Sequence, residues 1–277
     1  MDIEEFLASH PYAEATKRTY RDVIPRVLAL LKEAASASAA ELIQAVQATG
    51  WGNARQCLAL HATRKYLTWT YGNKHPARHA KLKRIQGKLQ RTVTPKLMLD
   101  LMATFNRYTP KGARDLALCS LMLDTGLRES EICNIQLADV DLDRRTLQVI
   151  VKGGQWESAI FSSETAAHIE HWLKLRVIQD GKNALFTSTR QRIGKPISPR
   201  GLQSIVREWG KFLGVPLSPH DFRRGMAVTA AMGGASELLI MLNGRWKSTD
   251  MVRRYTRGLL LEAMRDYLPL EKLENLR

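Results

Sequence analysis

Cysteine is scarce in this chain, and long hydrophobic runs are missing from it. The 277 residues include three cysteines, Cys57, Cys119 and Cys133, whose wide spacing is not typical of a metal site or a disulfide framework. No apolar run approaches the roughly 20 residues that a membrane span requires, and the acidic N-terminus lacks a signal-peptide pattern. We therefore expect buried thiols in a reducing cytosol, with no membrane and no metal.

Acidic residues are few relative to basic ones. The chain has 42 Lys and Arg residues against 27 Asp and Glu residues, and its formal net charge is +15 at pH 7. Such an excess favours a polyanionic partner, with nucleic acid as the first candidate, over a basic protein that has no such partner. The hydrophobic share of 44% is sufficient for real cores, and a length of 277 residues favours two domains.

Residues 1–72 are predicted to form an all-helical first domain. The helices are expected at residues 12–31, with a kink at Pro25, and at residues 39–49 and 53–71. The third helix presents basic side chains on a face separate from its apolar residues, and these include Arg55, Arg64 and Lys65. Such a face is either simply solvated or a surface that binds DNA.

The basic segment that follows, residues 73–93, contains no acid and is predicted to be a linker. Its positive side chains include Lys81, Lys83 and Arg84. Linkers are often charged for solubility alone, but an acid-free basic segment between two basic domains is suited to lie along a phosphate backbone. We therefore expect this segment and the preceding helix to bind the DNA backbone.

Residues 94–277 are predicted to form a second, mostly helical domain. The almost wholly apolar residues 115–124 indicate a buried central helix that ends near Gly126. Serine followed by proline indicates further helix starts at Ser198 and Ser218.

Two extended runs interrupt the helices of this second domain. Residues 146–151 and 156–161 indicate a β-hairpin that carries Lys152 at its turn. Arg128 directly follows the buried helix, and a cation so close to the interior requires an anionic partner. That partner is either a substrate anion or, as a purely structural alternative, Glu131 three residues later.

Titratable residues of another kind gather near the C-terminal end of the sequence. His220 and Arg223 share one face of the helix that begins at Ser218, and they can move a proton and grip a phosphate. Tyr255 follows on a helix that begins at Ser248, among the basic residues Arg253, Arg254 and Arg257. A tyrosine surrounded by arginines is a candidate nucleophile for a phosphate; the alternative is a half-buried surface aromatic.

These motifs, in their order and spacing, resemble those of the tyrosine recombinase/integrase family, and most of all its Xer-like and Cre-like members. The residues that carry the resemblance are Thr125-Gly-Leu-Arg128-Glu-Ser-Glu131, Lys152 on a hairpin, His220-Asp-Phe-Arg223, and Tyr255. The resemblance implies a mainly α fold with a small antiparallel sheet in an α+β catalytic domain, residues 94–277. It also implies an all-α, SAM-like core-binding domain, residues 1–72, joined by the linker 73–93 into a C-shaped clamp on DNA.

The resemblance also assigns roles to individual residues. The catalytic positions of the family match Arg128, Lys152, His220, Arg223, Trp246 and Tyr255, and Glu131 matches the supporting acid. The two arginines and the Trp246 N–H would stabilise charge on the phosphate, His220 would take the proton of Tyr255, and Lys152 would protonate the leaving 5′ oxygen. In one departure from the family pattern, Gly244 does not directly precede the catalytic position of Trp246.

A 3′-phosphotyrosyl intermediate keeps the energy of the broken bond, so no cofactor is expected. The implied activity is site-specific recombination, by way of a Holliday junction, on double-stranded DNA with inverted-repeat half-sites. The implied assembly is a homotetramer on two sites, with a dimer on each site, in the cytoplasm at the nucleoid. The alternatives are a type IB topoisomerase-like DNA strand transferase and a non-catalytic DNA-binding protein on the same fold.

Overall fold

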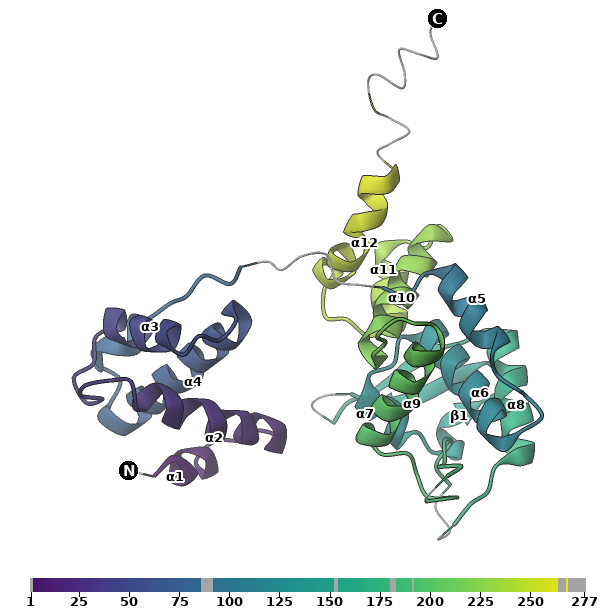
Figure 1. The fold of residues 1–277 in the computed structure, drawn as a ribbon, viewed down its shortest axis with the longest axis horizontal. Helices are drawn as coiled ribbons and strands as arrows, with labels where there is room; N and C mark the ends of the chain where they lie inside the picture. Colours follow the sequence, from purple (N-terminus) through teal and green to yellow (C-terminus); the bar gives the residue numbers. More distant parts are fainter. Residues whose placement is uncertain are drawn as a thin grey trace, which may run out of the picture. The chain divides into compact units, whose positions relative to one another are not determined.

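The chain divides into two units, Met1–Lys88 and Leu89–Arg277 (Figure 1). The structure is a computed structural model that describes residues 2–85, 92–151, 154–179, 183–190, 192–263 and 268. Among the described helices, none combines the length and the apolar character needed to cross a membrane.

The first unit is wholly helical in its described part. Its helices are α1 (Ile3–Ala8), α2 (Glu14–Leu28), α3 (Ala39–Ala48), α4 (Asn53–Tyr71) and the 3-10 turn η1 (Pro76–His79). Pro25 lies in the last turn of α2, which ends three residues later. Phe6, Val23, Leu42 and Leu67, one from each α-helix, are fully buried in a common core. The predicted helices are therefore all present, with α4 over the predicted residues.

The segment 73–85, predicted to be linker, belongs to this first unit. Ala77 and Ala80 are buried in its core, and the buried His75 ring lies 2.9 Å from the carbonyl oxygen of Ala34. Asn53, at the start of α4, donates to the Lys83 carbonyl and accepts from the Ile85 N–H. The segment packs on the first unit because its small apolar side chains are buried and because polar side chains hydrogen-bond to the backbone. Its composition alone is that of a linker.

The second unit consists of helices around one small sheet. Its elements are α5 (Pro95–Ala103), α6 (Pro110–Thr125), α7 (Glu129–Asn134), η2 (Leu137–Asp139), β1 (Val140–Asp141), β2 (Thr146–Ile150), β3 (Trp156–Ile160), α8 (Ser163–Leu175), α9 (Pro199–Phe212), α10 (Pro219–Met232), α11 (Glu237–Gly244) and α12 (Thr249–Ala263). The strands pair antiparallel in the order β1-β2-β3. The predicted fold class, mainly α with a small antiparallel sheet, is confirmed.

Four of these helices begin in the same way. In α5, α6, α9 and α10 a serine or threonine occupies the N-cap and a proline occupies the first helical position. The proline lacks an N–H that would be unpaired there, and its fixed φ angle suits the first turn. This local chemistry is why their starts can be predicted from the sequence alone.

Helix α6 is the centre of the second unit. It is buried from Gly112 to Met122 and packs against α8 and α10. It ends at Gly126, whose φ of 56° and ψ of 31° are left-handed, as glycine allows. The chain after this turn therefore emerges from the core next to α10.

Candidate active site

Arg128 lies where the chain leaves the core, at the N-cap of α7. Its backbone N–H donates to Glu131 Oε2 at 2.8 Å, and its Nη1 donates to Glu131 Oε1 at 2.5 Å. About a third of the Arg128 side chain is exposed, whereas the Glu131 side chain is 2% exposed. Arg128 therefore has both a structural anchor, as the alternative interpretation supposed, and a surface open to a substrate.

The carboxylate of Glu131 is kept ionised by its surroundings. Burial acts to raise its pKa, but the Arg128 N–H and the charges of Arg245 and Arg128 act in the opposite direction and prevail, so the pKa of Glu131 is lowered. A buried carboxylate in this state is a fixed negative centre that orients guanidinium groups.

Arg223 is the second arginine of the site and comes from α10. It is 4% exposed, and it donates to the carbonyl oxygens of Gly126 and Gly244. Its guanidinium carbon lies 4.3 Å from the centroid of the Trp246 ring. Burial, together with the charges of Arg128 and Arg245, lowers the pKa of Arg223 to about 9. An anion bound beside this group would relieve that repulsion.

Trp246 and Tyr255 complete the cluster from the chain after α11. Their ring centroids are 5.7 Å apart, and Trp246 is buried while Tyr255 is half-buried. Neither the indole N–H of Trp246 nor the hydroxyl of Tyr255 forms a hydrogen bond among the described residues. The neighbouring Arg253 ties α12 to α11 through Glu237, at 2.9 Å. The indole N–H of Trp246 and the hydroxyl of Tyr255 are thus available to a ligand.

His220 and Lys152 are the two remaining predicted catalytic residues. The His220 side chain is exposed in the first turn of α10, three residues before Arg223, and forms no hydrogen bond among the described residues. Lys152 lies outside the described residues. The strand ends beside its turn are described: Ile150 and Trp156 face each other across the hairpin, and both are more than half exposed.

The sequence prediction missed how the tripeptide Asn243-Gly244-Arg245 joins these groups. A Cβ atom on Gly244 would lie 2.1 Å from the Trp246 ring, so only glycine lets the ring fold back over the chain. Arg245, not a glycine, takes the left-handed C-cap of α11, with a φ of 54°. That conformation costs a non-glycine residue about 1–2 kcal/mol. The departure from the family pattern noted in the sequence thus coincides with Arg245, a residue that contacts the site.

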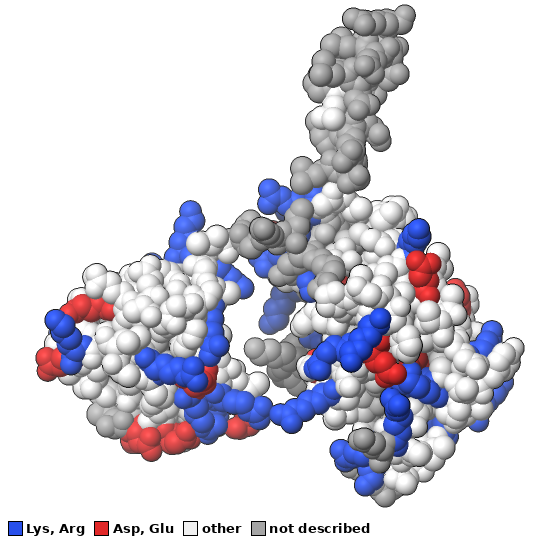
Figure 2. All heavy atoms as spheres, viewed as in Figure 1, with Lys and Arg blue, Asp and Glu red and all other residues white. Residues whose placement is uncertain are grey.

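The residues predicted to bind DNA fall into two groups. Arg55 pairs with Asp22 at 2.5 Å, Arg64 donates to the Ala80 carbonyl, and the Lys65 ammonium lies 5.5 Å from the Tyr12 ring centroid. All three therefore have partners within their own unit. The other group, Lys81, Lys83 and Arg84, is exposed. Figure 2 shows Lys and Arg side chains over the visible face of both units.

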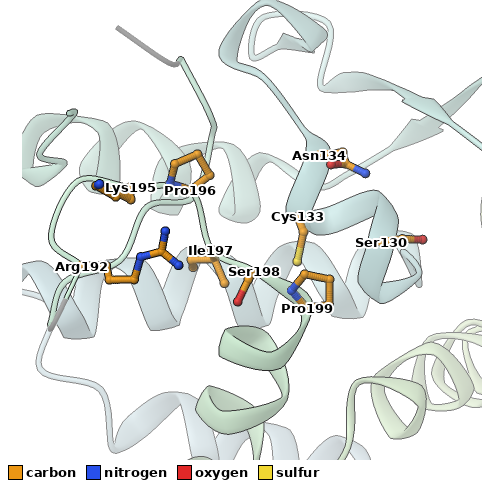
Figure 3. A pocket seen from close by; sticks show the side chains of 9 residues that line it. All are labelled: Ser130, Cys133, Asn134, Arg192, Lys195, Pro196, Ile197, Ser198 and Pro199. Carbon is orange, nitrogen blue, oxygen red and sulfur yellow. The ribbon is translucent and has the colours of Figure 1, made fainter. Parts of the chain in front are cut away.

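Two hollows lie in the described part of the second unit. One of about 460 Å³ lies between α7 and the segment before α9, and Figure 3 shows the side chains around it, including Cys133, Arg192 and Ser198. Among the predicted catalytic residues that the structure describes, Trp246 lines the second hollow and the others line neither. The Arg128 side chain is about a third exposed and Tyr255 is half-buried, so a double-stranded substrate can reach both from the surface.

The second hollow, of about 800 Å³, is an apolar groove between β3, α10 and α11. We call it the apolar groove. Ile160, Leu239 and Leu242 line it and are each more than half exposed, and Arg245 and Trp246 form part of its wall. An exposed apolar surface of this kind is typical of a protein contact.

The charge of the cluster indicates what it binds. Three guanidinium groups, on Arg128, Arg223 and Arg245, face the carboxylate of Glu131, and the carboxylate of Glu157 also acts on Arg245. The cluster is therefore positively charged and suited to an anion with several oxygens, such as a phosphodiester.

Residues 91–259 match the model of the phage integrase family. Tyrosine recombinase XerC of Vibrio cholerae serotype O1 is 34% identical over 145 residues, which are 50% of this chain and 46% of that protein. Tyrosine recombinase XerD of Neisseria meningitidis serogroup B is 30% identical over 200 residues, 69% of this chain and 68% of that protein. The chain thus spans about half the length of the first of these relatives.

Solved structures show the same fold at low sequence identity. The XerH site-specific recombinase bound to a palindromic difH substrate superposes with a TM-score of 0.76 at 15% identity, over 93% of this chain and 80% of that one. The Tn1549 transposon integrase in complex with transposon right end DNA superposes with a TM-score of 0.68 at 14% identity, over 95% and 98%. The likeness therefore extends beyond the residues matched by the family model.

Proposed function

Because this chain belongs to the phage integrase family, that of the tyrosine recombinases, we propose that it is a site-specific DNA recombinase that cuts and rejoins strands through a 3′-phosphotyrosyl intermediate. The main observation in support of the proposal is that two arginines from distant parts of the sequence bind the same turn, beside a tryptophan and a tyrosine. Arg128 and Arg223 donate to the successive carbonyls of Arg245 and Gly244, which directly precede Trp246.

The proposed chemistry uses groups of this chain alone. The oxygen of Tyr255 attacks the phosphorus, the bond to the 5′ oxygen breaks, and a 3′-phosphotyrosine forms. Arg128, Arg223 and the indole N–H of Trp246 stabilise the charge on the non-bridging oxygens. His220 takes the proton of the tyrosine, and Lys152 gives a proton to the leaving oxygen. Attack by a 5′ hydroxyl from another strand reverses these steps, completes the exchange and frees Tyr255.

A covalent bond between Tyr255 and a 3′ phosphate is the observation that separates this function from DNA binding alone. The type IB topoisomerase alternative predicts the same bond but a different product. It would relax a supercoiled plasmid of any sequence, whereas the recombinase exchanges strands between two copies of one site. Strand exchange in the presence of EDTA is the expected result, and relaxation of plasmids without the site would favour the alternative.

We further propose that the exposed basic side chains at 81–85 contact the phosphate backbone of double-stranded DNA. Neutralising Lys81, Lys83 and Arg84 together should reduce the slope of log K against log salt by about 2–3, since each phosphate contact contributes about 0.9. Titrating binding over a range of salt concentrations measures this slope.

A matched control replaces three exposed basic residues on α2 and just after it, Arg18, Arg26 and Lys32, by the same neutral residue. Their removal lowers the net charge equally but should leave the slope closer to that of the parent. Equal slopes for the two triple variants would mean that only overall charge matters, and that the segment 81–85 makes no contact of its own.

The proposed assembly is a homotetramer on two sites, each site with inverted-repeat half-sites bound by a dimer. The apolar groove supports it, because Ile160, Leu239 and Leu242 leave a surface to be covered. The proposed occupant is the last amphipathic segment of a neighbouring copy, around Leu259, Leu260, Leu261 and Met264, where the apolar residues recur. The side chains of Leu260 and Leu261, and the whole of Met264, lie outside the described residues.

Replacing Leu239 and Leu242 together by glutamate should leave half-site binding intact and abolish the pairing of two sites. Both side chains are exposed, so the fold loses little, whereas a charge in the groove opposes an apolar occupant. Gel-shift and size-exclusion measurements on DNA separate the two stages. Leu99→Glu on α5, where Leu99 is 69% exposed, is the control, and equal pairing by control and double variant would count against this assembly.

A further inference from the structure

Arg245 combines features that are rarely found together. It is one of two non-glycine residues with positive φ in the described part of the chain, the other being Arg145. Arg245 is 5% exposed, and its left-handed conformation is one that side chains rarely adopt. A strained and buried cation must be held by strong contacts, because neither property is favourable by itself.

The guanidinium of Arg245 makes those contacts in three directions. Nη1 donates to the Asn243 carbonyl at 2.5 Å, and Nη2 lies 3.2 Å from both the Thr125 carbonyl and Glu131 Oε2. Nε is buried and has no hydrogen-bond partner among the described residues. The group therefore links the end of α6, the acid of α7 and the last turn of α11, and its side chain is 1% exposed.

The backbone around Arg245 holds the two arginines assigned to the phosphate. The Arg245 carbonyl accepts from Arg128 Nη2 at 3.1 Å, and the Gly244 carbonyl accepts from Arg223 Nη2 at 2.5 Å. Any shift of this turn would move both guanidinium groups at once.

Glu131 shows why a third guanidinium is useful. Its Oε1 accepts from Arg128 Nη1, while its Oε2 accepts from the Arg128 backbone and from Arg245. With Oε2 occupied in this way, the carboxylate binds the Arg128 side chain through one nitrogen only. Of the rest of the Arg128 fork, Nη2 donates to the Arg245 carbonyl, and about a third of the side chain is exposed.

We propose that Arg245 is a positioning residue of the active site: it fixes Glu131 and the turn before Trp246, so that Arg128 and Arg223 face the same phosphate. This role rests on the proposed recombinase function. The Arg245 side chain is 1% exposed and its terminal nitrogens donate to Glu131 and to two backbone carbonyls, so it acts through the residues that it contacts.

The test measures the single-turnover rate at which the full-length protein forms a covalent adduct with a nicked suicide substrate. Arg245→Gly keeps the left-handed turn but removes the guanidinium, and the rate should fall about 10²-fold, as expected for misplaced reacting groups. Affinity for the site should remain close to that of the parent. Arg245→Lys keeps the charge without the fork and should recover part of the rate.

Arg145→Gly is the matched control. It removes the same side chain from the other left-handed position, which is exposed in the turn between β1 and β2, and it should react like the parent.

The pH dependence distinguishes positioning from a general loss of structure. Glu131 is faced by Arg128 from the start of α7, by Arg245 from the end of α11 and by Arg223 from α10. Removing Arg245 takes away one of the charges that lower the pKa of Glu131. The acid limb of the pH–rate profile should therefore move to higher pH in Arg245→Gly and stay in place in Arg145→Gly.

Equal rates for Arg245→Gly and Arg145→Gly would overturn the proposal. So would a loss of rate that only parallels a loss of DNA affinity and melting temperature in both Arg245 variants, because that would be a purely structural role. Failure of the parent protein to form any adduct would count against the recombinase function itself, and the positioning role would fall with it.

Discussion

Tyr255→Phe is expected to bind the recombination site as the parent protein does and to form no covalent adduct. The substitution removes one hydroxyl, which has no hydrogen-bond partner among the described residues, and leaves the ring that contacts Trp246. Folding and DNA binding should therefore be unaffected, whereas no other group can take the place of the attacking oxygen.

The measurement uses a nicked suicide substrate, whose short released strand diffuses away and cannot reverse the reaction. The parent should accumulate an adduct at the 3′ phosphate, and peptide mapping should place it on Tyr255. Tyr20→Phe is a suitable control, because Tyr20 is a buried tyrosine of the first unit, in the core of α2. An adduct that persists in Tyr255→Phe, or that maps to another residue, would overturn the assignment of the nucleophile.

Lys152→Ala is expected to slow the cleavage of normal DNA by about 10²–10⁴-fold, the usual contribution of a general acid. The reason is that a 5′ alkoxide is a poor leaving group unless it receives a proton, and a lysine that follows β2 in the sequence is proposed to deliver one. A substrate with sulfur in the 5′-bridging position needs no such proton, because a thiolate leaves readily. The variant and the parent should therefore cleave the sulfur substrate at similar rates.

The comparison of the two substrates contains its own control. Tyr255→Phe should be inactive on both, since sulfur replaces the need for an acid and not the need for a nucleophile. A Lys152→Ala protein that stays slow on the sulfur substrate would show that Lys152 acts in some other way, for example by holding the DNA.

Local chemistry explains which parts of the fold could be predicted from the sequence. Two helix starts depend only on neighbouring residues, namely Ser198-Pro199 and Ser218-Pro219. The end of α6 depends in the same way on the glycine that follows it. The hairpin followed from β-branched residues on either side of a glycine-containing turn. The resemblance to the tyrosine recombinases predicted Arg128, Arg223, Trp246 and Tyr255 as one set. The structure brings these four residues together.

What could not be predicted depends on contacts between distant residues. The left-handed conformation of Arg245 is stabilised by Glu131, which lies 114 residues away. The residues next to Arg245 in the sequence therefore do not indicate this conformation. Gly225 lies two residues after Arg223, and a Cβ there would lie 2.2 Å from the side chain of the distant Val93. Likewise, the partner of Arg55 is Asp22 on another helix, and a basic face read from one helix cannot reveal it.

The packing of residues 73–85 on the first unit has a practical consequence for dissecting the protein. A fragment cut at residue 72, where the composition changes, would lose Ala77 and Ala80 from its core and the His75 contact with Ala34. A fragment that runs to Ile85 keeps these and both hydrogen bonds of Asn53. The longer boundary also retains Lys81, Lys83 and Arg84, so an isolated first unit made for binding assays would carry its stabilising segment and its exposed cations on the same short length of chain.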